Sequence, residues 1–142
     1  MDFNIYAWVF LLGRILYGGF FILGGLGHFQ NLQMMSGFAA SKGVPAARIG
    51  VMLSGLLILA GGLCVAIGVA VPFGLGCIIA FLVIVTPWMH NFWTEQDMMQ
   101  RINQRVNFQK NVALLGAALM LLVYRSVVLY YPAGWPMSLI NR

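Results

Sequence analysis

Residues 5–29 read IYAWVFLLGRILYGGFFILGGLGHF, an apolar run with one internal cation, Arg14, and a glycine cluster that leads into His28. A helix needs roughly 20 apolar residues to cross the hydrocarbon core of a membrane, so this run is long enough to span it. A cation within a span is costly unless another group compensates it. The run therefore predicts a first membrane helix whose Arg14 face points into a helix bundle.

The composition extends this prediction to the whole chain. Of its 142 residues, 61% are hydrophobic and 8% are charged, whereas a soluble domain carries about 25% charged residues. Three more apolar runs follow the first, which predicts an all-α integral membrane four-helix bundle formed by a single domain, residues 1–142. The predicted membrane helices span residues 4–27, 47–69, 72–93 and 108–131.

Two connections on one side of this bundle are long enough to carry structure. In the first, Leu32, Met35 and Ala39 recur at helical spacing, and Gly43 follows as a stop signal, which predicts a short helix lying at the membrane interface between helices one and two. The second, residues 94–109, is the longest polar stretch. It is expected to be a solvated loop with a short surface helix.

The net charge of +5 is spread over loops and helix ends, which argues against nucleic acid and for membrane topology and lipid headgroups. The two long connections hold more cations than the opposite side, where Arg142 lies with Arg14 and Arg125. Because cytoplasmic loops are enriched in Lys and Arg, both termini are expected on the outer, periplasmic side. The cations of the two connections are Lys42, Arg48, Arg101, Arg105 and Lys110.

Polar residues are predicted at two levels of the bundle. On the terminal side, Arg14 and Arg125 have no acidic residue within any span. They could form a cationic pocket for an anion, a lipid phosphate or a quinone carbonyl, or they could anchor on backbone carbonyls, aromatic faces and headgroups.

Cys64 and Cys77 flank the turn between helices two and three, either as small packing residues or as a facing pair.

On the loop side, His28 and His90 are expected at the same depth in the membrane. Imidazoles titrate near neutral pH, so they could relay protons or bind a quinone oxygen, or they could simply bond to nearby backbone. No helical i, i+4 pair of metal ligands is present, and no metal site is predicted. The candidate ligand-binding residues of this level are His28, His90, Asn91, Trp93, Lys110 and Asn111.

The order of several short motifs resembles the DoxX family between residues 14 and 122. The motifs are Arg14-Ile15-Leu16, residues 21–29 (FILGGLGHF), Gly43-Val44-Pro45, Gly61-Gly62-Leu63 with Gly68, His90-Asn91-Phe92 and Gln109-Lys110-Asn111. Two positions depart from the family pattern. His28 stands where a lysine is common, and the region of Ile58 lacks the glutamate that is common before the paired glycines.

The resemblance implies a four-helix protein of the bacterial inner membrane. It further implies a redox-associated subunit that interacts with quinone or an electron-transfer partner, such as a subunit of a quinone-linked oxidoreductase rather than a stand-alone enzyme. No cofactor is predicted apart from quinone as the candidate ligand. A non-enzymatic scaffold or assembly subunit, and a lipid- or anion-binding membrane protein, stay open as alternatives. The expected partners are membrane lipids and either a protein subunit or further copies of the chain.

Overall fold

The computed structural model describes residues 5–130, with side-chain positions for all of these except residue 6 and residues 125–130. The chain forms five α-helices and one short 3₁₀ helix, and no strand is found in this part of the chain. The elements are α1 (Ile5–Gln30), α2 (Leu32–Ser41), α3 (Ala47–Ile67), α4 (Val71–Met89), η1 (Phe92–Thr94) and α5 (Met98–Tyr130). The all-α prediction is confirmed.

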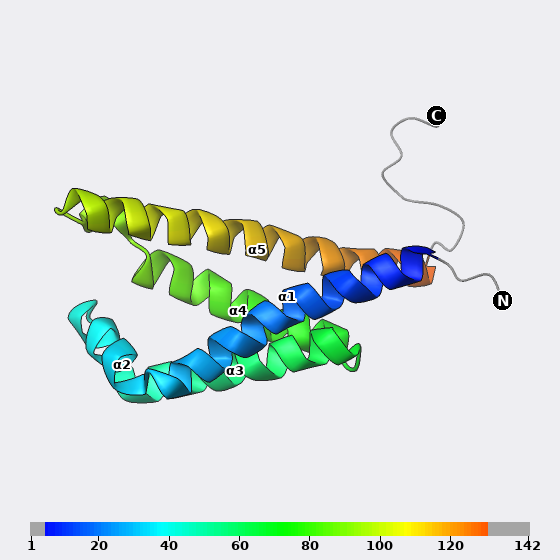
Figure 1. Ribbon diagram of the computed structural model, residues 1–142, viewed down its shortest axis with the longest axis horizontal. Helices are drawn as coiled ribbons and strands as arrows, with labels where there is room; N and C mark the ends of the chain where they lie inside the picture. The colour runs from blue at the N-terminus through cyan, green and yellow to red at the C-terminus, as the bar shows by residue number, and fades with distance from the viewer. Residues whose placement is uncertain (1–4, 131–142) are drawn as a thin grey trace.

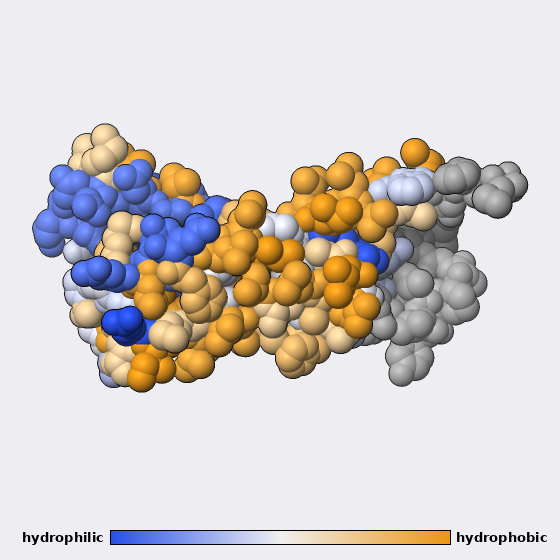
Figure 2. Space-filling view, turned by 60° about the horizontal axis from the view of Figure 1, so that its bottom comes forward, coloured by the Kyte–Doolittle hydropathy of each residue, from blue (hydrophilic) through white to orange (hydrophobic). Residues whose placement is uncertain are grey.

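Four of these helices, α1, α3, α4 and α5, are long and apolar enough to cross a membrane. Their outer faces stay apolar, with exposed side chains such as Leu23, Leu53 and Ile84. Figure 2 shows hydrophobic side chains over the middle of the molecule, while hydrophilic ones gather at the end that holds α2 and the start of α5. This surface is that of a multi-pass membrane protein whose exposed apolar faces contact lipid.

Close approach of backbones holds α1 against α3, the most extensive helix contact in the molecule. A Cβ on Gly18 would lie 2.5 Å from the carbonyl oxygen of Gly62, and a Cβ on Gly62 would lie 2.6 Å from that of Gly18. Only residues without a side chain fit at this crossing. Paired small residues are the usual basis of helix association in membranes, where apolar burial supplies little driving force.

The remaining helices close the core around Phe21, Leu75, Ile78 and Leu82, which are at most 2% exposed. α4 packs on α3, and α5 packs on α4 (Figure 1). Cys64 and Cys77 are both free thiols, and each lies against a glycine of the facing helix, Gly74 and Gly61 respectively. Their place in the α3–α4 contact is that of small packing residues.

The helix boundaries differ from the sequence-based prediction mainly at α5. This helix begins at Met98 instead of near residue 108, so most of the polar stretch expected as a loop forms its first turns. Asp97 is the reason, because its carboxylate accepts the backbone N–H of Gln100 at 2.8 Å and caps the helix. A short helix, α2, does follow α1, and its position at the membrane interface stays a prediction.

Candidate functional site

Buried polar side chains gather at one place in the described part of the chain. Thr86 of α4 and Gln104 and Asn111 of α5 are the three buried polar residues, at 4%, 9% and 7% exposure. All three lie on the packed helices α4 and α5, where Thr86 precedes His90 by one helical turn and Gln104 hydrogen-bonds the His90 ring. Buried polar groups are costly in an apolar bundle, so their concentration marks this contact as the candidate site.

Thr86 and His90 share one face of α4, because they are four residues apart at its C-terminal end. The backbone N–H of His90 donates to the carbonyl of Thr86 at 3.1 Å, which continues the helix to its cap. Pro87 lies between them and has no N–H, so no helical bond from it reaches the carbonyl of Val83. The pair therefore sits where the backbone ladder of α4 is already interrupted.

The Thr86 hydroxyl has no partner. Its Oγ1 is fully buried and makes no hydrogen bond within residues 5–130. A helical threonine normally bonds the carbonyl four residues before it, and an unpaired buried hydroxyl costs about 1–3 kcal/mol. A group this costly is retained in functional sites more readily than in a packed core.

His90 is held in one tautomer by α5. Its Nδ1 lies 2.7 Å from the side-chain oxygen Oε1 of Gln104. Because that oxygen only accepts hydrogen bonds, Nδ1 must carry the proton. Nε2 has no partner among the described residues, so it is free to accept a hydrogen bond from a ligand when the ring is neutral, or to donate one when the ring is protonated.

An aromatic cluster covers the outer edge of this site. Phe92, Trp93 and Phe108 contact one another edge to face, with ring centroids 5.2–5.8 Å apart. They join η1 to α5 just beyond His90, and Trp93 itself is 53% exposed. Asn111 is buried one turn further along α5 than Phe108, and no hydrogen bond of its side chain is present in the described structure.

His28 lies apart from His90. Its Nδ1 donates to the carbonyl of Gly24 at 2.8 Å, its ring meets Phe81 at 6.0 Å, and its Cβ rests on Gly55 of α3. Phe81 precedes His90 by nine residues of α4, which corresponds to about 13 Å along the helix axis. His28 thus contacts α4 well before the C-terminal end that carries His90. In both histidines Nδ1 is protonated, and Nε2 has no partner in residues 5–130.

The other loop-side candidates serve local contacts. Asn91 accepts a hydrogen bond from Lys42 at 2.6 Å, and Lys42 also pairs with Glu95 at 2.5 Å. Lys110 bonds Asn107 in its own helix and lies over the ring of Phe20, 5.7 Å from its centroid. Asn91 therefore helps to fasten α2 to the α4–α5 connection, and Lys110 bridges α5 to α1.

On the terminal side, α3 compensates the charge of Arg14. Nη2 donates to the carbonyl of Ala66 at 3.1 Å, and the guanidinium packs against Gly68, which ends α3 at φ 81°. The C-terminal end of a helix is electronegative, so a cation is favourable there. The backbone of Arg125 lies in α5, but its side chain is outside the described residues.

Sequence reasoning missed Thr86 and Gln104. Thr86 was not among the predicted site residues, yet its i, i+4 spacing to His90 in an apolar helix was a usable signal. Gln104 lies in the stretch expected to be a solvated loop with a short surface helix. Its inward position follows only once α5 is known to begin at Met98.

The comparisons with known proteins give one match. The family model described as DoxX matches residues 9–91, which include most of α1, all of α2 to α4, and His90. Neither the curated proteins nor the solved structures contain a match to the chain.

Proposed function

Because the chain belongs to the DoxX family, we propose that it is a membrane subunit that binds a quinone headgroup between α4 and α5 and works beside an electron-transfer partner. The observation that carries this proposal is the unpartnered pair on α4, the buried Thr86 hydroxyl and the free Nε2 of His90. A quinone offers two oxygens that accept hydrogen bonds, and the corresponding quinol offers two hydroxyls that can also donate.

The chemistry of the pair suits both forms of such a ligand. The Thr86 hydroxyl can donate to a quinone oxygen or accept from a quinol. Nε2 of His90 accepts from a quinol when neutral and donates to a quinone when protonated, so it can hold the proton that accompanies electron transfer. Reduction of a quinone takes two electrons and two protons. The electrons would come from the redox partner, while the chain positions the ring and passes protons.

The surroundings support the same assignment. The hydrogen bond from Nδ1 of His90 to Gln104 leaves Nε2 as the free nitrogen. Phe92, Trp93 and Phe108 give an apolar aromatic edge against which an aromatic headgroup can pack. The exposed apolar faces of α4 and α5 lead directly into lipid, where quinones dissolve. His28 packs on Phe81, which precedes His90 by about 13 Å along α4, so the free Nε2 of His28 would serve as a separate proton-exchanging position.

Binding of decylubiquinone to the purified protein tests the proposal, measured by quenching of tryptophan fluorescence. Thr86→Val keeps the shape and removes the hydroxyl, and His90→Phe removes the nitrogen; each is expected to weaken binding about tenfold, the equivalent of one good hydrogen bond. Ser54→Ala is the matched control, since its hydroxyl bonds only the Val51 carbonyl of its own helix.

The outcome separates the proposal from its alternatives. Equal affinity in the wild type, Thr86→Val and His90→Phe would contradict it. A stoichiometric partner retained in mild detergent, together with no quinone binding, would favour a scaffold subunit instead.

A further inference from the structure

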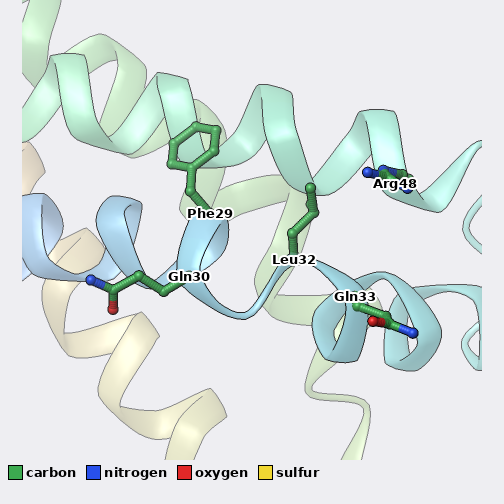
Figure 3. Close-up of a pocket in the computed structure, with 5 residues that line it drawn as sticks. All are labelled: Phe29, Gln30, Leu32, Gln33 and Arg48. Atoms are coloured by element: carbon green, nitrogen blue, oxygen red, sulfur yellow. The ribbon is translucent and has the colours of Figure 1, made fainter.

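A concave site lies on the other helices of the same end. A hollow of about 450 Å³ opens where α1 turns into α2 and α3 begins. Figure 3 shows Phe29 and Leu32 extending from the α1–α2 corner toward α3, which carries Arg48. The lining residues are Phe29, Gln30, Leu32, Gln33 and Arg48. None of them belongs to the Thr86–His90 site.

The charge of Arg48 is uncompensated. Its side chain is exposed and makes no ion pair or hydrogen bond within residues 5–130. The two carboxylates of this part of the chain are engaged elsewhere, Glu95 by Lys42 and Asp97 by the backbone of Gln100. The hollow thus has a cation on one wall and no acidic side chain to occupy it.

The position of the hollow at the ends of two candidate spans indicates which layer of the membrane surrounds it. Gln30 is the last residue of the first candidate span, and Arg48 is the second residue of the next one. Both therefore lie where the hydrocarbon core ends and the headgroup layer begins. Phe29, at 37% exposure, and Leu32 give the hollow an apolar floor, and the amides of Gln30 and Gln33 give it a polar rim.

From this combination we infer that the α1–α2–α3 hollow binds the phosphate group of an anionic phospholipid. The guanidinium of Arg48 presents parallel N–H donors that match two phosphate oxygens. The glutamine amides can donate to the remaining phosphate oxygens or to glycerol hydroxyls, and the start of an acyl chain can lie on Phe29 and Leu32. α3 also begins without a side-chain cap, which leaves its positive end facing the headgroup layer.

Native mass spectrometry tests this inference after reconstitution in phosphatidylcholine vesicles with and without phosphatidylglycerol. The wild type is expected to retain phosphatidylglycerol, and Arg48→Gln is expected to retain about fivefold less, the effect of one cation near an anionic lipid surface. Arg101→Gln is the matched control, because Arg101 is an exposed cation at the same end but outside the hollow. Gln33→Glu should also reduce retention by placing a negative charge on the rim, whereas Gln109→Glu in α5 should not.

Three results would overturn the inference. They are equal lipid retention by Arg48→Gln and the wild type, an equal loss in Arg101→Gln, and displacement of the lipid by inorganic phosphate, which would make the ligand a free anion. Because the hollow shares no residue with the Thr86–His90 site, lipid retention and decylubiquinone binding can fail independently.

Discussion

Arg14 of α1 donates from Nη2 to the carbonyl of Ala66 in the last turn of α3, so the cation inside the first span caps a neighbouring helix. Carbonyls at a helix C-terminus lack intrahelical partners, and the half-buried Arg14 satisfies one of them while it meets the negative end of the helix dipole. No acidic side chain is required for this compensation. Packing of α1 on α3 thus gives Nη2 of Arg14 a partner, while its buried Nε has none within residues 5–130.

Arg14→Gln is expected to lower the free energy of unfolding by about 2 kcal/mol, because it removes a charged hydrogen bond and the interaction with the helix end. Unfolding in mixed micelles measures this change. Gly68→Ala should also destabilise, since a Cβ there would lie 2.5 Å from Nη2 of Arg14 and φ is 81°. The two losses should be less than additive when combined, because Arg14→Gln removes the overlap. Strict additivity would contradict the contact.

The adjacent glycines Gly18 and Gly19 differ in their contacts where α1 crosses α3 at Gly62. Gly18→Ala should destabilise the bundle by about 2 kcal/mol, because its Cβ would overlap the Gly62 carbonyl and push α1 from α3. A Cβ on Gly19 meets nothing within 4 Å. Gly19→Ala should therefore be neutral or stabilise by up to ~1 kcal/mol through helix propensity. Similar losses in both variants would argue against this crossing.

Hydropathy alone was sufficient to predict the four membrane helices, because the bilayer sets the length of an apolar run. It could not locate the start of α5, since the first turns of this helix are polar. A local signal was present, however. Asp97 with Gln100 three positions later is the pattern of a helix N-terminus, and Asp97 does cap α5.

The candidate site was only half predictable. His90 and Asn111 could be selected as polar residues near the ends of apolar runs. Which of them are buried together depends on the register of α4 against α5, and the His90–Gln104 hydrogen bond defines that register only in the folded protein. For Arg14, backbone carbonyls were among the expected partners, but the carbonyl of Ala66 could not be named, because a backbone carbonyl contributes nothing recognisable to a sequence.

Thr86→Val offers a test of whether the orphan hydroxyl is retained for function. Valine has a similar shape and no polar group, so the substitution should raise the free energy of unfolding by about 1–2 kcal/mol. The same variant should bind decylubiquinone more weakly, because it lacks the hydroxyl that is proposed to bond the quinone. A residue kept for function can lower the stability of the folded protein. A destabilised Thr86→Val protein would show that the hydroxyl has a partner in the folded state.

The Lys42–Glu95 ion pair should control how tightly α2 is held. The two side chains are 12% and 21% exposed, and Lys42 also binds Asn91. Lys42→Met should increase amide hydrogen exchange in α2 and η1, by roughly the factor that corresponds to 1 kcal/mol, while the membrane helices keep their protection. Lys110→Met is the control, because Lys110 contacts Asn107 of its own helix and Phe20 of α1, and neither of these residues belongs to α2 or η1. Unchanged exchange in Lys42→Met would mean that the pair contributes nothing to docking of α2.

The proposed orientation, with both termini outside, can be tested by cysteine accessibility in cells. Cys64→Ala and Cys77→Ala give a background without thiols, and both positions pack on glycines, where alanine fits. If the cation-rich connections face the cytoplasm, a membrane-impermeant maleimide should label Val69→Cys, in the α3–α4 turn, in intact cells. Ser41→Cys, at the end of α2, should react only after permeabilisation. Both native residues are exposed in the folded protein, so labelling depends on the side of the membrane and not on burial. The reverse pattern would place the termini, and the Arg14 end of the bundle, in the cytoplasm.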